Sequence, residues 1–353
     1  MSVTVRSAAR VLDLDFHGAA VSVLCQDSDL VERLARDFAY FILPDSRRSG
    51  GTAADSVLEV RVEPVPQDRL PRGQGLSWRS ARISTKGSVR SVDYGGQALL
   101  VYDLAAERGT LCGPDRDLLH ELAYLAVLSR AGDLLDGQGL HRAHALGFSF
   151  RGRGGLLFLP MNGGKSRLAL ELLSRPGFAL LSDDLPLIEA HGRTLRAFPL
   201  RLGLRGSDAA GIPESFVRTF KRRRFGVKRL VDVAYFQDRI ADRAPLDWIF
   251  VASRNGAQAP SLVPCSKPEA ASSLLAPVVL GLGLPQVLEL MLPPPPFIPG
   301  SLRLARIAGR RLAACLRAAE QAECSRLRLC DDPAANADLM AAYLEADLSK
   351  RSP

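Results

Sequence analysis

Alternation of apolar and polar residues predicts strands near the start of the chain. Residues 17–25 and 57–63 alternate in this way and are rich in valine, and a period of two residues is typical of a half-buried strand. Between them, residues 27–43 carry apolar side chains at helical spacing, with Asp27 or Ser28 placed to cap the helix. The pattern therefore predicts a strand, a helix and a second strand, in that order.

Short strands punctuated by proline, glycine and serine are expected over residues 65–110. Within them, residues 91–104 consist of two apolar stretches around Gly95 and Gly96, a pair that suits the tight turn of a hairpin. These elements predict an N-terminal α+β module over residues 1–112, for which we expect partner binding as one role.

The rest of the chain, residues 113–353, is expected to form a second domain, since 353 residues are enough for about two. It begins with a long amphipathic helix over 115–136, followed by a glycine break. Its later elements are expected to be strands within 185–205 and near 229–235 and 247–252, helices over 212–224, 302–319 and 331–348, and a buried helix within 274–296 that breaks at Pro285.

The most informative part of this domain is an apolar segment interrupted by a glycine-rich turn. We expect strands near 143–150 and 155–159, a turn over 160–166, a helix over 165–174 and an apolar strand over 178–181. The turn has the sequence Pro-Met-Asn-Gly-Gly-Lys-Ser, and the last strand ends in Ser-Asp-Asp. The order of strand, glycine turn, Gly-Lys-Ser and helix is the geometry of a phosphate-binding loop.

The physical basis of such a loop is the free backbone N–H groups and the partial positive charge at a helix N-terminus. Gly163 and Gly164 would let the backbone curl around a phosphate group, and Asn162 is expected to bind the cofactor in the same turn. Lys165 would reach the outer phosphates of a nucleotide, and the Ser166 hydroxyl would bind Mg²⁺. ATP and Mg²⁺ are therefore the expected cofactors.

Only half of the full pattern G-x-x-x-x-G-K-[ST] is present, because Leu159 occupies the place of the first glycine. An ordinary helix N-cap with a surface lysine is the alternative interpretation. The apolar strand before the turn and the helix after it favour nucleotide binding.

Two acidic residues end the apolar strand, 18 residues after Lys165. If the two strands are parallel and joined by a crossover helix, their ends meet at one sheet edge, which places Asp183 and Asp184 beside the glycine turn. One carboxylate can hold Mg²⁺, and the other can accept the proton of an attacking hydroxyl. A turn signal after a strand is the alternative for this pair.

Composition narrows the class of protein. Hydrophobic residues make up 47% and charged residues 24%, which are ordinary globular values and exclude a disordered chain or a collagen-like fibre. The net charge of +8 suits anionic partners, although solvated arginines explain it equally well. Aromatic residues are only 6% and sparse among the arginines, which argues against nucleic-acid binding.

The six cysteines include no C-x-x-C pair, and the five histidines add no zinc spacing. Reduced thiols in a cytoplasmic protein are therefore expected. Charged residues near the N-terminus argue against a signal peptide, and prolines and a glutamate interrupt the most apolar stretch, so no membrane partner is expected. The sequence leaves open whether the protein forms a homo-oligomer.

Three features stand at a characteristic spacing around the glycine turn: His144, Lys165-Ser166 21 residues later, and Asp183-Asp184 after an apolar strand. With these features the chain resembles the HPr kinase/phosphorylase family, and more closely the HPr-kinase-related proteins of bacteria. The resemblance covers about 70 residues, 139–206, with a looser similarity toward the C-terminus. It implies an α/β protein in which a P-loop kinase domain has a phosphoenolpyruvate-carboxykinase-like fold with a mixed sheet.

The resemblance also implies roles for individual residues. Lys165 would bind phosphate, Ser166 and Asp183 would lie at the metal, and Asp184 would match the proton acceptor. His144 would match the active-site histidine, with an interior histidine satisfied by backbone as the alternative and His141 as a rival.

The chain departs from the family pattern in two places. The first loop glycine is absent, and the family's Glu-Arg-Gly-x-Gly stretch appears as Pro-Leu-Arg-Leu-Gly over 199–203, without a carboxylate. The family's catalytic arginine has no fixed place here. The candidates are Arg201, Arg205, Arg223, Arg224 and Lys228, and the run 221–229 is either a basic flap or a solvated charge run.

These observations predict an ATP-dependent phosphotransferase, a serine kinase-like enzyme acting on a protein or peptide hydroxyl. Proteins of this type are associated with bacterial peptide natural products, so the resemblance makes a small ribosomal peptide a plausible acceptor. The alternative is a nucleotide-binding adaptor or peptide chaperone without phosphoryl transfer, which the two departures favour.

Overall fold

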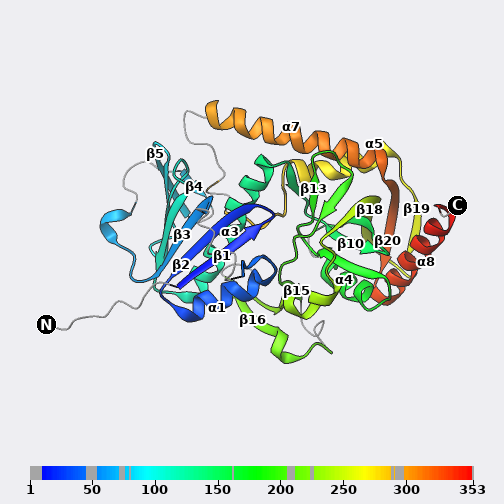
Figure 1. Ribbon diagram of the computed structural model, residues 1–353, viewed down its shortest axis with the longest axis horizontal. Helices are drawn as coiled ribbons and strands as arrows, with labels where there is room; N and C mark the ends of the chain where they lie inside the picture. Colours follow the sequence, from blue (N-terminus) through cyan, green and yellow to red (C-terminus); the bar gives the residue numbers. More distant parts are fainter. Residues whose placement is uncertain are drawn as a thin grey trace. The chain divides into compact units, whose positions relative to one another are not determined.

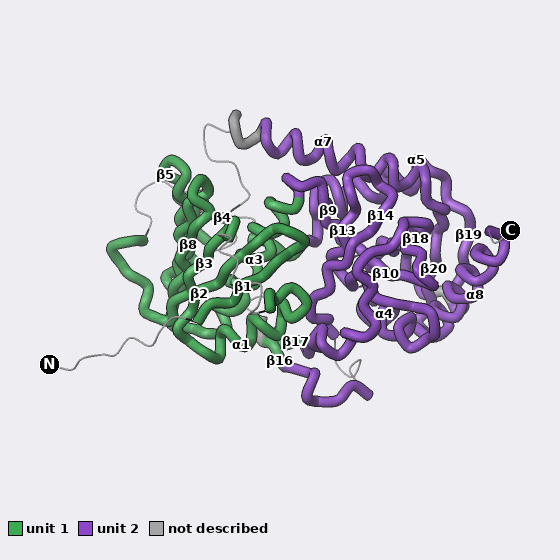
Figure 2. The backbone as a smooth tube through the Cα atoms, in the orientation of Figure 1, with its two compact units in different colours: residues 1–135, 219–228, 285–301 green, residues 136–218, 229–284, 302–353 purple. Residues whose placement is uncertain are grey.

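The computed structural model describes residues 10–44, 54–70, 76–78, 81–160, 163–204, 211–222, 226–287, 290 and 298–351. The chain divides by its internal contacts into two compact units, coloured separately in Figure 2. Unit 1 comprises residues 1–135, 219–228 and 285–301, and unit 2 comprises 136–218, 229–284 and 302–353. The long helix after residue 112 thus belongs mostly to unit 1, and the expected domain boundary stays a prediction.

Unit 1 is built on one mixed eight-stranded sheet. Its strands, in spatial order, are β1 (Arg10–Phe16), β2 (Ala19–Cys25), β3 (Ser56–Val62), β8 (Arg108–Gly113), β7 (Leu99–Asp103), β6 (Val89–Asp93), β5 (Ala81–Lys86) and β4 (Leu76–Trp78). Its main helices are α1 (Ser28–Asp37) and α3 (Arg116–Gly137). The expected strands, the long helix and the hairpin of β6 and β7 are confirmed.

Two details of unit 1 differ from the sequence prediction. Strand β1 was not expected, although Leu12 and Leu14 alternate with Asp13 and Asp15 as in a half-buried strand. Both aspartates lie on the more exposed side of the strand, with Leu12 and Leu14 buried. The helix expected over 27–43 ends at Asp37, and a 3₁₀ turn follows at Ala39–Phe41.

Unit 2 contains a mixed nine-stranded sheet. The main path runs through β12 (Phe178–Ser182), β10 (Leu146–Phe150), β11 (Arg153–Phe158), β18 (Arg243–Ala257), β14 (Thr194–Arg196), β13 (Leu187–Glu189) and β9 (Leu140–Arg142). Strand β20 (Glu323–Cys330) runs parallel to β18, and β19 (Ser261–Pro264) pairs with β20. The chain is therefore a mixed α/β protein, as expected.

The two strands that lead to the expected site residues, β11 and β12, are not neighbours in the sheet. Strand β10 lies between β11 and β12 and is antiparallel to both. Strands β11 and β12 consequently run in the same direction, and their carboxyl ends still reach the same edge of the sheet. The central place of β10 follows from its composition, since every residue of Leu146–Phe150 is buried.

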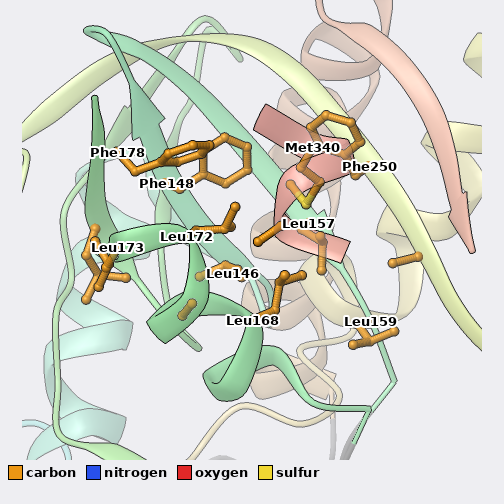
Figure 3. Close-up of a cluster of buried hydrophobic side chains, with 14 of the residues drawn as sticks. Leu146, Phe148, Leu157, Leu159, Leu168, Leu172, Leu173, Phe178, Phe250 and Met340 are labelled. Atoms are coloured by element: carbon orange, nitrogen blue, oxygen red, sulfur yellow. The ribbon is translucent and has the colours of Figure 1, made fainter. Parts of the chain in front are cut away.

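A hydrophobic core lies between this sheet and two helices, α4 (Lys165–Leu173) and α8 (Pro333–Arg351). Figure 3 shows Leu168 and Leu172 of α4 and Met340 of α8 pointing toward the sheet, where Phe148 of β10 and Phe250 of β18 lie. Helix α4 buries the residues spaced three and four apart, so its N-terminus is held at the sheet edge by packing.

The remaining elements of unit 2 complete the layers in Figure 1. Helix α5 (Lys267–Leu274) packs against β18 and β20, and α7 (Ile298–Gln321) follows later in the chain. Among the described residues, no helix combines the length and apolar character that a bilayer crossing requires.

Two expected helices of the central region differ from the structure. Within the described residues 212–222, the short helix expected in 212–224 is only a 3₁₀ turn, Glu214–Phe216, and β16 (Val217–Arg222) follows, which pairs with β17 (Gly226–Val231) next to β15 (Leu202–Leu204). The β-branched residues Val217 and Thr219 favour the strand.

Within 274–296, α5 ends at Leu274 and continues only as a π-helical turn, Leu275–Val279. Gly281 and Gly283 follow with φ of 65° and 91°, a left-handed conformation that ends the helix before Pro285. Residues 288, 289 and 291–297 lie outside the described part.

Candidate active site

The glycine turn closes directly onto the first residue of α4. Gly164 is the N-cap of the helix with φ of 99°, a conformation that a side chain would strain. A Cβ on Gly163 would lie 2.5 Å from Cγ of Leu159, so no larger residue fits there. The helix N-terminus is thereby open to an anion. Asn162, expected in the same loop, lies outside the described residues.

Lys165 is buried at the start of α4 and turns toward the strand ends. Its Nζ lies 2.9 Å from Nε2 of His144 and donates to the carbonyl oxygen of Leu159 at 3.1 Å. Burial lowers the pKa of the Lys165 ammonium group, and the nearby carboxylates Asp184 and Asp183 oppose that shift.

His144 lies between β9 and β10 and joins Lys165 to Asp184. Because Nε2 accepts from the ammonium group, the neutral ring carries its proton on Nδ1, which lies 3.4 Å from Oδ1 of Asp184. Burial lowers the pKa of His144, and the charge of Lys165 lowers it further, while Asp184 raises it. His144 is therefore held in its neutral form.

The two consecutive aspartates serve different neighbours. Asp183 is buried, and its Oδ2 accepts from the Ser166 hydroxyl at 3.0 Å. The Asp184 side chain is 44% exposed and lies 3.7 Å from Nζ of Lys165. Adjacent residues at a strand end point in opposite directions. Asp183 therefore lies beside Ser166, where a metal ion could bind, and Asp184 lies beside Lys165 and His144, where a base could act.

Ser182 fixes the turn that carries both aspartates. Its hydroxyl donates to the carbonyl oxygen of Phe198 at 2.7 Å and accepts from the backbone N–H of Leu185 at 2.9 Å. These two hydrogen bonds to backbone atoms hold the turn in place, and the turn positions the two carboxylates.

A glycine segment closes over the imidazole of His144. The backbone N–H of His144 donates to the carbonyl oxygen of Pro277 at 3.2 Å. A Cβ on Gly283 would lie 2.8 Å from Cδ2 of the ring, so backbone alone fits against it. One face of the ring is covered, and its nitrogens lie toward Lys165 and Asp184.

His141, the rival of His144, belongs to a different cluster. Its Nδ1 lies 2.9 Å from Oδ1 of Asp136, and Arg311 donates to both oxygens of the same carboxylate. All three side chains are buried. The contacts of His141 are thus those of an interior, structural histidine. This is the role that had been the alternative interpretation for His144.

Arg254 is a site residue that the sequence analysis missed. It follows the apolar stretch of β18, which runs parallel to β11, so both strands end at the same edge. A Cβ on Gly164 would lie 3.7 Å from its Nη1, and its Nη2 donates to Asp331 at 2.9 Å. It lines a hollow beside the glycine turn, with Arg167, Leu168, Leu329, Cys330, Asp331, Pro333 and Asn336 among the other lining residues. The signal for it was an arginine just after an apolar strand.

Three of the five residues named as candidates for the catalytic arginine are in parts of the chain that the structure does not describe. Arg205, Arg223 and Arg224 lie outside the described residues. The stretch 199–203 leads into β15 and supplies no carboxylate.

The oxygen atoms of Ser166 and Asp183 fit one side of a Mg²⁺ site. They lie within hydrogen-bond distance of each other at the end of the glycine turn, and Mg²⁺ prefers few protein oxygens completed by water and phosphate. In the described part of the chain, no three His, Cys, Asp or Glu side chains gather as a metal-binding group.

No protein-family model and no curated protein matches this chain. Among solved structures, the chain is similar to the HPr(Ser) kinase/phosphatase from Coxiella burnetii, with 17% sequence identity and a TM-score of 0.22. The match covers 35% of this chain and 76% of that chain. A likeness of this size does not establish a family.

Proposed function

We propose that this protein is an ATP-dependent phosphotransferase that acts on a hydroxyl group of a protein or peptide. The observation that carries the proposal is the convergence of Lys165, Ser166, His144, Asp183 and Asp184 at the N-terminus of α4. These side chains come from three separate segments of the chain, and together they supply a cation, a metal-type oxygen pair and a base.

Nucleotide binding would depend on the glycine turn and its neighbours. The free N–H groups at the start of α4 would donate to phosphate oxygens, and Lys165 would neutralise the outer phosphates. Arg254 lies beside Gly164 and would add a second positive charge. Ser166 and Asp183 would hold Mg²⁺, which when bound would neutralise charge on the phosphate groups.

The transfer step would use Asp184 as proton acceptor. The acceptor hydroxyl would give its proton to the Asp184 carboxylate while its oxygen bonds to the γ-phosphorus, and the bond from phosphorus to the β-bridging oxygen would break to release ADP. His144 would orient Asp184 through its Nδ1–H. Because phosphoryl transfer depends mainly on positioning and charge, this set of groups is sufficient.

The direct test is transfer of label from [γ-³²P]ATP to candidate peptides in the presence of Mg²⁺, with binding of a fluorescent ATP analogue measured in parallel. We expect the wild type to bind nucleotide and to label a peptide hydroxyl, and Lys165→Ala to lose both. A wild type that neither binds the analogue nor transfers label would overturn the proposal.

A nucleotide-binding adaptor without transfer is the second candidate. Two observations favour it: Leu159 packs against Gly163 where a loop glycine would leave space, and residues 199–203 contain no carboxylate for a second metal ligand. Asp184→Asn separates the two candidates. An enzyme would lose transfer while still binding the ATP analogue, whereas an adaptor would be unaffected in every function it has.

A further inference from the structure

One side of α7 is apolar, exposed and repeats at the spacing of a coiled-coil seam. Leu302, Ala305, Gly309, Leu312 and Leu316 follow one another at intervals of three and four residues, so they lie along one side of the helix. The three leucines are 67%, 37% and 52% exposed. We call these five residues the α7 stripe.

The opposite side of the helix already has its contacts within unit 2. Ala314, Cys315 and Ala318 are buried, as is Arg311 with its partner Asp136. The stripe is therefore not needed to attach α7 to the sheet, and its leucines have no role in the core.

Gly309 lies in the middle of the stripe, and none of its contacts with the described residues requires a glycine there. A glycine inside a helix costs about 0.5–1 kcal/mol relative to alanine. Yet no atom of the described residues lies within 4 Å of the place where its Cβ would be. A glycine on a helix surface allows close approach of another backbone, and no backbone of the described residues takes that place at Gly309.

The charges beside the stripe indicate what kind of helix fits. Exposed arginines flank it at Arg303, Arg306, Arg310 and Arg317, and residues 302–319 contain no aspartate or glutamate. All four arginines lie on the same side of the stripe. A second copy of the chain packed antiparallel on the stripe would therefore bring two rows of arginines together, and like charges at such positions are destabilising. A helix with acidic flanks would meet them with opposite charge.

We propose that the α7 stripe binds an acidic amphipathic helix of a partner protein or peptide, with its backbone crossing at Gly309. The partner would place apolar side chains on the leucines and glutamates or aspartates beside the arginines. Leu302 and Leu316 are 14 positions apart, so the stripe is roughly 21 Å long, about four turns of a helix. The lack of aromatic residues on the stripe and the central glycine favour a protein helix over an anionic membrane surface.

The test uses the full chain and a labelled synthetic helix of about 21 residues with leucine at the a and d positions and glutamate at e and g. The glutamates also keep the peptide from pairing with itself. Binding is measured by fluorescence anisotropy, against a peptide in which lysine replaces every glutamate. We expect the acidic peptide alone to bind, with an affinity that weakens as salt is added.

Three variants locate the binding. Leu316→Glu and Gly309→Ala should each weaken binding about tenfold or more, because central contacts carry most of the energy of an interface. Gly309→Ala should at the same time leave the unfolding temperature unchanged or higher, so loss of binding cannot come from loss of folding. Leu282→Glu is the matched control, since Leu282 is 60% exposed but lies outside the stripe.

Several outcomes would overturn the proposal. These are no binding of the acidic peptide, equal binding by Leu316→Glu, stronger binding to phosphatidylcholine–phosphatidylglycerol vesicles than to the peptide, or a dimer by light scattering that Leu316→Glu abolishes. None of these results depends on phosphoryl transfer, so failure here and failure of the proposed function are distinguishable.

Discussion

Unit 2 contains two pairs of histidine and aspartate whose histidines are only three residues apart in the sequence, and their surroundings are opposite. His141 and Asp136 are sealed in the interior with Arg311. His144 faces a carboxylate that is 44% exposed and an ammonium group at the end of a glycine turn. The same two residue types thus build a structural tie in one place and a candidate reaction centre in the other, and access to the carboxylate makes the difference.

Breaking the sealed pair should give the largest effect. Asp136→Asn leaves the buried guanidinium of Arg311 without a charged partner, which should lower the free energy of unfolding by about 3–5 kcal/mol. Urea denaturation measures it. The matched control is Asp338→Asn, which removes one carboxylate partner of Arg175 from an exposed pair and should cost at most about 1 kcal/mol. Equal losses in the two variants would contradict the distinction.

Breaking the open pair should change activity rather than stability. Asp184→Asn removes the proposed proton acceptor, so label transfer should fall about a hundredfold, roughly 3 kcal/mol of barrier. The fold should be kept because Ser182, and not the carboxylate, fixes the turn. Transfer at the wild-type rate would exclude Asp184 as the base.

The cover of His144 offers a more selective perturbation. Gly283→Ala places a Cβ 2.8 Å from the ring at a φ of 91°, so the ring has to shift and transfer should fall about tenfold. Gly152→Ala is the control, since its φ is 82° but no atom of the described chain lies within 4 Å of the added group. Both variants should lose about 1–2 kcal/mol of stability from backbone strain. Only the first should lose transfer.

The smallest effect expected is a change in the titration of His144, followed by NMR of its ring nitrogens. Burial first, and then the charge of Lys165, hold its pKa below the usual 6.5, and Asp184→Asn should lower it further because a raising charge is removed. As pH falls below about 6.5 the unfolded chain takes up this proton before the folded chain does, so folding stability should decrease. A pKa at or above that of free imidazole would contradict the burial of the ring.

Local patterns predicted the site better than they predicted its frame. The glycine turn, α4 and the aspartates after an apolar run are short-range features, and the expected residues do meet. The insertion of β10 between β11 and β12 depends on pairing between distant segments, which no local period encodes. The charged stretch around Val217 and Thr219 suits a surface helix, and its strand depends on pairing with the later segment β17 as well as on these β-branched residues. Arg254 was missed because it reaches the glycine turn from a strand 90 residues away.

The middle strand β10 has a consequence for how this site varies among related sequences. It holds the ends of β11 and β12 about 10 Å apart, two strand spacings, independently of the connection from α4 to β12. Residues 174–177 join those two elements at the far edge of the sheet, so insertions there would leave the lysine and the aspartates in place. The number of residues between the glycine turn and the two aspartates is therefore expected to vary among related sequences. The buried strand β10, which precedes the strand leading into the glycine turn, is expected to be the more constant feature.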